Sequence, residues 1–198
     1  MTRARIALLR HGHTAWNRAG RIQGRADVPL DAEARDQLSR LRLPDPYNRW
    51  TLVASPLGRA VETARLVAGR PPEIVPELIE LDWGEWQGMR GRDLLADANS
   101  GYRNLEEWGW GFQPPGGESL EMAWRRIAPW IVAANGNMVA VTHIGIIRVL
   151  LARATGWNFF GPSPIPVKRN RLFILTVRAE GSLSINEAPV RLNERMIP

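Results

Sequence analysis

Three apolar runs that each end in polar side chains constrain the fold of this chain more than any other feature. The runs span residues 6–9, 51–54 and 137–142. The residues that follow them are Arg10 and His11, then Ser55 and Pro56 leading to Arg59, and finally His143. Such runs, free of charged side chains, are typical of strands buried on both faces. Because parallel strands place their carboxyl ends at one edge of a sheet, we expect these polar groups to meet there.

Helical and extended patterns alternate along the rest of the chain. Helices are predicted over residues 31–41, 59–67, 118–134 and 146–154, and further strands over 73–76, 171–177 and 183–186. Thr14, Asp31 and Ser55 are candidate helix N-caps, with Pro56 at the first helical position after Ser55. Pro129 is expected to interrupt or kink its helix. The alternation predicts an α/β fold with a largely parallel sheet covered by helices, in a single domain over residues 1–198.

Composition narrows the classes of function. The chain has no cysteine, which removes disulfides, thiolate metal sites and thiol nucleophiles. No apolar stretch approaches the roughly 20 residues of a membrane-spanning helix, and the N-terminus lacks a signal-peptide pattern, so we expect a cytoplasmic protein. The net charge is +6, and every basic residue except Lys168 is an arginine. Because no dense basic block marks a nucleic-acid tail, we favour a small anionic substrate over DNA or RNA.

Two histidines and two arginines at one sheet edge predict phosphoryl transfer. Arginine binds phosphate bidentately and stays charged at working pH. A neutral imidazole can attack phosphorus, and a second imidazole can donate a hydrogen bond to a phosphoryl oxygen. A carboxylic acid must also deliver a proton to the leaving alcohol.

Four segments resemble the histidine phosphatase superfamily, the phosphoglycerate mutase-like family. They are residues 10–12 (RHG), 55–64 (SPLGRAVETA), 80–88 (ELDWGEWQG) and 142–145 (THIG), in the order and rough spacing of that family. Each is weak alone, but the four together are highly specific. The resemblance implies a three-layer sandwich, with a mixed, mainly parallel sheet flanked by helices. It also implies a metal-independent phosphomonoesterase that needs no cofactor and acts on a small phosphorylated metabolite.

The resemblance also implies roles for particular residues. His11 would be the nucleophile that becomes phosphorylated, Arg10 and Arg59 would hold the phosphoryl group, and His143 would stabilise it during transfer. Glu80 would protonate the leaving oxygen and then activate water. The implied substrate-binding residues are Asn17, Gln23 and Gly24.

Some alternatives stay open on the sequence. The acid is Glu80 when Gly84 is aligned with the family, with Asp82 and then Glu77 as the other candidates. His13 stands where the family usually has Glu or Gln, and we expect it to lie outside the site and to affect only the pKa values of its neighbours. His11, His13 and His143 could form a zinc site, but Arg10 and Arg59 would repel a dication.

The segment 83–117 is unusually rich in tryptophan and is expected to form a lid over the phosphate pocket. Replacement of Trp108 or Trp110 by Ala should then change KM among phosphate esters more than kcat. A phosphatase is favoured over a mutase because the segments around this lid are short, although Arg90, Arg92 and Arg103 keep a phosphoglycerate mutase as an alternative. A non-catalytic phosphoester-binding relative is a further alternative, and the sequence leaves a homodimer open.

Overall fold

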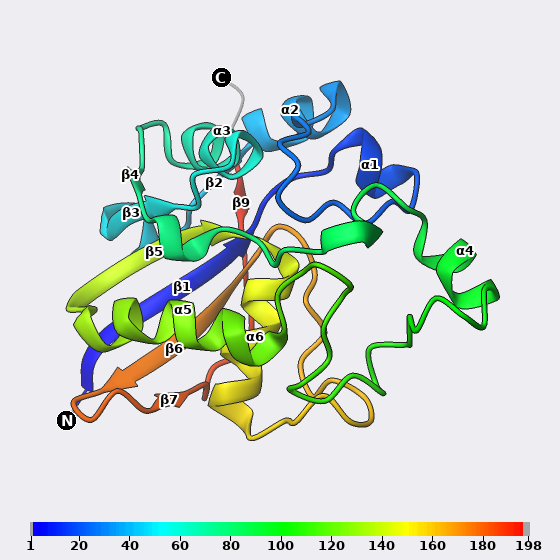
Figure 1. The fold of residues 1–198 in the computed structure, drawn as a ribbon. Helices are drawn as coiled ribbons and strands as arrows, with labels where there is room; N and C mark the ends of the chain where they lie inside the picture. The colour runs from blue at the N-terminus through cyan, green and yellow to red at the C-terminus, as the bar shows by residue number, and fades with distance from the viewer. Residues whose placement is uncertain (1, 196–198) are drawn as a thin grey trace.

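A computed structural model describes residues 2–195, which form a mixed seven-stranded sheet between helices (Figure 1). The strands are β1 (Thr2–Arg10), β3 (Thr51–Ala54), β4 (Glu73–Ile74), β5 (Gly136–Thr142), β6 (Arg171–Arg178), β7 (Leu183–Ser184) and β8 (Val190–Arg191). Their order is β4-β3-β5-β1-β6-β7, and β8 also pairs with β6. The neighbours from β4 to β1 pair in parallel, whereas β6 pairs antiparallel with β1, β7 and β8. The predicted α/β class with a mixed sheet is confirmed.

Helices cover both faces of this sheet. The α-helices of the described residues are α1 (Ala15–Arg18), α2 (Ala32–Ser39), α3 (Gly58–Ala68), α4 (Gly91–Ala96), α5 (Leu120–Ala133) and α6 (Ile144–Thr155). Single 3-10 turns occur at Tyr47–Arg49, Pro76–Leu78 and Gly84–Trp86. Helices α2 and α3 pack on one face of the sheet, and α5 and α6 pack on the other. None of the helices within residues 2–195 has the length and apolar character needed to cross a membrane.

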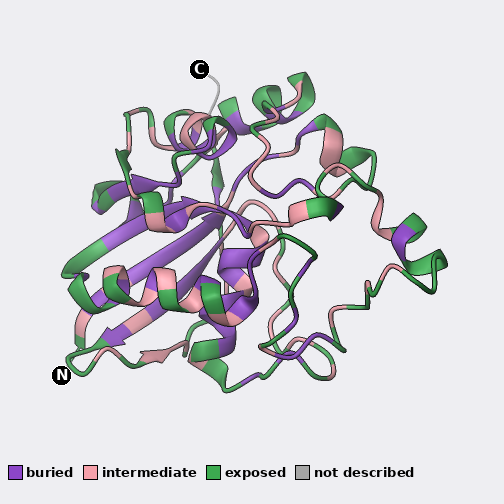
Figure 2. Cartoon of the chain, in the orientation of Figure 1, coloured by how far each residue is buried: buried purple, intermediate pink, exposed green. Residues whose placement is uncertain are grey.

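The alternation of side chains along β1 shows why its apolar run is buried on both faces. Ile6 and Leu8 join the hydrophobic cluster under α5 and α6, whereas Ala7 and Leu9 join the cluster under α2 and α3. All four are at most 1% exposed, and Figure 2 shows the central strands buried along most of their length. Burial of each large aliphatic side chain contributes about 1.5–3 kcal/mol, so the strand is held firmly between the two layers.

Most predicted elements are present, and the differences have local causes. Helix α5 runs without interruption through Pro129 and is capped by Ser119, whose side chain accepts a hydrogen bond from the Met122 amide. Thr14 and Asp31 are N-caps as predicted. The prediction for Ser55 and Pro56 is wrong, since α3 begins at Gly58 without a side-chain cap. A small antiparallel pair, β2 (Leu41–Arg42) with β9 (Asn193–Glu194), was not predicted.

The two ends of the segment 83–117 lie side by side and are joined through their backbones. The Glu118 amide donates to the Asp82 carbonyl and the Glu85 amide to the Pro115 carbonyl, both at 2.9 Å. Gly84 has a φ of +48° where a side chain would collide with the Pro115 carbonyl, so this closure requires glycine. Between its ends the segment is mostly irregular, apart from Gly84–Trp86 and α4.

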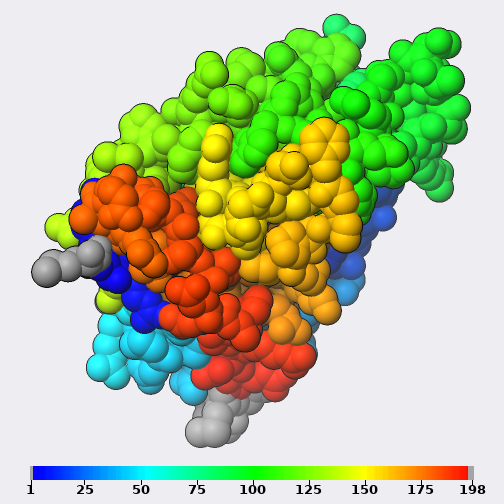
Figure 3. Space-filling view, turned by 90° about the horizontal axis from the view of Figure 1, so that it is seen from below, coloured from blue at the N-terminus to red at the C-terminus, as the bar shows by residue number. Residues whose placement is uncertain are grey.

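A second irregular stretch, residues 156–170, supports the segment 83–117 from below. Seen from that side, the golden residues after α6 lie against the green segment (Figure 3). The Gly161 amide donates to the Glu106 carbonyl at 2.9 Å, and Glu107 forms a β-bridge with Phe160. The two stretches are therefore joined through their backbones.

Candidate active site

The carboxyl ends of three neighbouring strands bring the predicted histidines and arginines together. β1 and β5 pair up to Arg10 and Thr142, and the ladder continues one residue further, because the His11 amide donates to the Thr142 carbonyl at 3.0 Å. His143 follows at once as the N-cap residue of α6. The imidazole centroids of His11 and His143 are 5.0 Å apart. Arg59 reaches the same place from the first turn of α3.

The surroundings of His11 fix which ring nitrogen is free. Nδ1 lies 2.7 Å from the Gly12 carbonyl oxygen, which can only accept, so Nδ1 carries the hydrogen. Nε2 is then left with its lone pair. Burial and the charges of Arg59, Arg10 and Arg169 hold the pKa of His11 well below its ordinary value. The ring is therefore neutral at neutral pH, the form that can attack phosphorus.

His143 is arranged as a hydrogen-bond donor. Its Nε2 lies 2.7 Å from the Ser55 hydroxyl oxygen, and both residues are completely buried. The Leu57 amide donates to the same oxygen at 3.4 Å. Among the described residues, Nε2 is the one acceptor within reach of the Ser55 hydrogen, so the hydroxyl donates to Nε2. The hydrogen of the neutral ring is then on Nδ1, which has no partner among the described residues. Burial, His11 and Arg59 lower the pKa of His143, so the ring stays neutral.

Two guanidinium groups stand beside these rings. Arg59 is fully buried and donates to the carbonyls of Ala26 and Gly24, each at 2.7 Å, which fixes its position from the loop 19–31. Burial and the charge of Arg169 lower the pKa of Arg10 to about 9. A dianionic ligand would relieve the repulsion between these positive charges. Arg10 and Arg59 therefore favour the binding of a phosphoryl group over the binding of any cation.

Glu80 is the buried carboxyl group of the site. One of its oxygens accepts from the Leu81 amide at 3.0 Å and the other from the Gly145 amide at 3.3 Å. A side chain at Gly145 would collide with this carboxyl group, so only glycine allows the approach. Burial raises the pKa of Glu80, which favours a protonated acid that can give up a proton. Asp82 does not line the pocket and instead bonds Arg25 and the Gly84 amide.

Asn17 and Gln23 form a chain of hydrogen bonds in the wall of the pocket. The Asn17 Nδ2 donates to the Gln23 Oε1 at 3.2 Å, and the Thr14 hydroxyl donates to the same oxygen at 2.8 Å. Arg169 donates to the Asn17 Oδ1 at 2.8 Å and to the His11 carbonyl at 3.2 Å. Arg169 is not among the predicted site residues, because it follows a proline-rich loop and belongs to no local motif.

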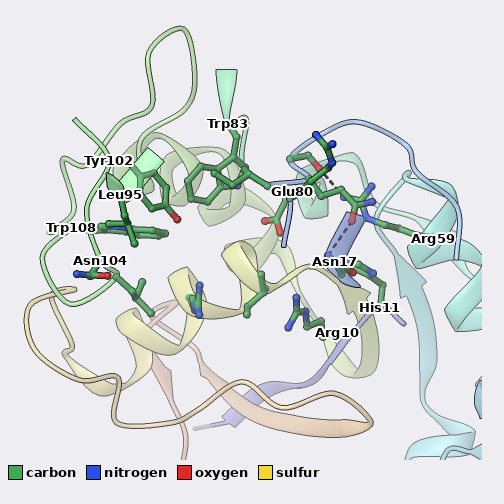
Figure 4. Close-up of a pocket in the computed structure, with 17 residues that line it drawn as sticks. Arg10, His11, Asn17, Arg59, Glu80, Trp83, Leu95, Tyr102, Asn104 and Trp108 are labelled. Atoms are coloured by element: carbon green, nitrogen blue, oxygen red, sulfur yellow. Dashed lines mark hydrogen bonds between the residues drawn. The ribbon is translucent and has the colours of Figure 1, made fainter. Parts of the chain in front are cut away.

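Seventeen residues line the pocket, which has a volume of about 310 Å³ (Figure 4). All the predicted site residues except His143 are among them; that ring lies fully buried beside His11. The segment 83–117 supplies Trp83, Leu95, Tyr102, Asn104, Leu105 and Trp108.

Several other predicted participants lie outside the pocket. Trp110 packs instead on Phe159 and under Arg153, with centroid distances of 5.1 and 4.0 Å. Arg90, Arg92 and Arg103, which supported the mutase alternative, do not line it, and His13 does not either. In residues 2–195 no three His, Asp or Glu side chains are grouped so that they could hold a metal ion.

The comparisons with known proteins agree with this geometry. The model of the histidine phosphatase superfamily (branch 1) matches residues 6–186. The chain belongs to the histidine phosphatase superfamily. Among curated members, an adenosylcobalamin/alpha-ribazole phosphatase of Salmonella typhimurium is 35% identical over 173 residues, which cover 78% of this chain and 84% of that protein. A glucosyl-3-phosphoglycerate phosphatase of Mycolicibacterium vanbaalenii is 30% identical and covers 77% and 74%.

Solved structures of the superfamily share the whole architecture. TTHB049 of Thermus thermophilus superposes with a TM-score of 0.72 at 32% identity, covering 96% of this chain and 99% of that one. A putative alpha-ribazole-5'-P phosphatase of Escherichia coli superposes with a TM-score of 0.72 at 26% identity, covering 99% and 98%. The phosphoglycerate mutase-like fold is therefore confirmed over nearly the full length.

Proposed function

We propose that this histidine phosphatase hydrolyses a small phosphorylated metabolite through a phosphohistidine at His11. The observation that carries the proposal is the state of the His11 ring, which is neutral, hydrogen-bonded through Nδ1 and free at Nε2 beside Arg10 and Arg59. The phosphatase names of its relatives support the same reaction.

In the first step, Nε2 of His11 attacks phosphorus as the ester bond breaks. Arg10 and Arg59 bind the phosphoryl oxygens, and the Nδ1 hydrogen of His143 donates to one of them. The protonated Glu80 gives its proton to the leaving oxygen, so that the alcohol departs neutral. The electron pair of the broken P–O bond stays on that oxygen.

In the second step, water takes the place of the alcohol. The Glu80 carboxylate accepts a proton from the water as its oxygen attacks phosphorus, and the P–N bond electrons return to Nε2 of His11. Inorganic phosphate leaves, and Glu80 is protonated again for the next turnover. Asn17, Gln23 and Gly24 would bind substrate at the rim, and the segment 83–117 would cover it.

The proposal includes catalysis without metal or cofactor, a single catalytic domain over residues 1–198, and a cytoplasmic location, where small phosphorylated metabolites are made. The test is hydrolysis of p-nitrophenyl phosphate in EDTA by the wild type and by His11→Ala. Turnover that survives EDTA and is lost in His11→Ala, with acid-labile phosphate on the wild-type protein, is the expected result.

Two other outcomes would replace the proposal. Bound phosphate without turnover of any ester would indicate a phosphoester-binding relative. Interconversion of 2- and 3-phosphoglycerate, dependent on the bisphosphate, would indicate a mutase.

A further inference from the structure

Arg148 is a lining residue of the pocket that the proposed reaction does not use. It lies on α6, four residues after Ile144, and both residues line the pocket because positions i and i+4 share one face of a helix. With a rise of about 1.5 Å per residue, Arg148 stands about 7.5 Å along the helix from His143. Its guanidinium thus faces the part of the pocket beyond the phosphoryl site.

No group of the protein neutralises this cation closely. In the part of the chain that the structure describes, no carboxylate oxygen lies within 4.0 Å of Arg148. Arg59, by contrast, has two carbonyl partners and Asp27 at 3.9 Å. Burial lowers the pKa of Arg148, and the more distant charges of Glu80 and Glu106 offset this only in part.

The charges of the pocket lining point to an additional anion. Four arginines line the pocket, namely Arg10, Arg21, Arg59 and Arg148, whereas Glu80 is the single carboxylate among the lining residues. A phosphoryl group at His11 neutralises Arg10 and Arg59. Arg21 extends into solvent and donates to the Gly88 carbonyl at 2.7 Å. Arg148 therefore remains as a half-buried charge of the pocket wall with no carboxylate of the described residues close to it.

We propose that Arg148 forms a second anion subsite, so that the preferred substrates are phosphoesters whose leaving group carries a carboxylate a few atoms from the ester oxygen. This proposal rests on the proposed phosphatase function and specifies its substrate class. A carboxylate fits better than a second phosphate, because one guanidinium fork matches one carboxylate and supplies one charge. Tyr102 and Asn104 line the pocket with Arg148 and would contact the rest of the leaving group.

The test compares two esters that differ in one group. 3-Phosphoglycerate carries a carboxylate where glycerol 3-phosphate carries a hydroxymethyl group. We expect the wild type to show a kcat/KM about 10- to 100-fold higher for the acid, which is the range of a charge-assisted hydrogen bond. In Arg148→Gln this preference should fall to about threefold or less, while the kcat/KM for glycerol 3-phosphate changes little.

Two further variants separate charge from structure. Arg148→Lys keeps the charge and should retain part of the preference. Arg153→Gln removes a cation from the same helix that stacks on Trp110 and Trp124 outside the pocket, at 4.0 and 4.9 Å; it should leave the preference unchanged. An equal loss for both esters in Arg148→Gln, or a wild type with no preference for the acid, would overturn the subsite.

A binding measurement keeps the two proposals separate. Calorimetry with His11→Ala, in the presence and absence of Arg148→Gln, measures the affinity for both esters without turnover. Tighter binding of 3-phosphoglycerate that depends on Arg148 supports the subsite even if the wild type hydrolyses nothing, an outcome that would refute only the phosphatase. Equal affinities for both esters, together with hydrolysis of p-nitrophenyl phosphate, would refute only the subsite.

Discussion

Replacement of Ser55 by Ala tests whether the Ser55 hydroxyl determines which ring nitrogen of His143 carries the hydrogen. The Ser55 hydroxyl lies 2.7 Å from Nε2 of His143 at a fully buried position. Without it, Nε2 loses its partner, and the ring is free to place its hydrogen on Nε2 instead of Nδ1. The proposed donor to the phosphoryl group would then be lost in part of the molecules.

The size of the effect follows from two limits. An unsatisfied buried polar group lowers the free energy of unfolding by about 1–3 kcal/mol. Complete loss of one donor to a transition-state oxygen lowers kcat by about 10²- to 10³-fold. Ser55→Ala removes both the preference between tautomers and the hydrogen bond that holds the His143 ring in place. Because a displaced donor costs more than a half-populated tautomer, we expect a loss of about 10- to 100-fold in kcat/KM, with a stability loss of about 2 kcal/mol.

Thr142→Val is a matched control. The Thr142 hydroxyl is also fully buried and donates to the Leu78 carbonyl at 2.7 Å, but it forms no hydrogen bond with either imidazole. We expect a similar loss of stability in urea unfolding and a change in kcat/KM of about threefold or less. The explanation fails if both variants lose the same activity, or if ¹⁵N NMR finds the hydrogen of His143 on Nε2 in the wild type.

Three further predictions concern pH and positioning. Because burial raises the pKa of Glu80, ionisation of this carboxyl group destabilises the fold as the pH rises above about 4.5. Glu80→Gln should therefore raise the melting temperature at pH 7 but not at pH 4. The pKa values of His11 and His143 are lowered, so the stability that the neutral rings provide is complete above about pH 6.5 and falls below it; urea unfolding between pH 7 and 5 should show net proton uptake by the unfolded state. Arg169→Met frees the Asn17 amide and the His11 carbonyl, and it should lower kcat for p-nitrophenyl phosphate about tenfold while phosphate still binds, as phosphate inhibition would show.

The strand ends were predictable because each is encoded locally. The runs before Arg10, Ser55 and His143 had to be buried on both faces, and parallel pairing then brought their ends together. The neighbouring arginines also lie within short sequence motifs, and so does the glycine two residues after His143. This part of the site can therefore be predicted without knowledge of contacts between residues that are distant in sequence.

Other residues depend on contacts that no short motif encodes. Ser55 precedes a proline and a helix, as a cap would, but its hydroxyl bonds His143, which is distant in sequence. Arg169 reaches His11 and Asn17 from a loop without regular structure. Within the tryptophan-rich segment, Trp108 faces the pocket and Trp110 faces Phe159, although the two are only two residues apart. Trp108 is held by stacking on Phe112 within the segment, whereas Trp110 packs against Phe159 and against Arg153 of α6.

The closure of the segment 83–117 has a consequence for how such enzymes diversify. Its two ends meet at the backbone contacts of Asp82 with Glu118 and of Glu85 with Pro115, and its residues 88 and 89 bond Ile22 in the loop that holds Arg59. The two histidines, by contrast, follow strands of the sheet. A segment of another sequence and length can therefore replace the residues between these contacts without a change in the register of any strand. Chimeras that carry the corresponding segment of a relative should prefer phosphoesters of the same alcohol as that relative does. Their catalytic residues would stay unchanged.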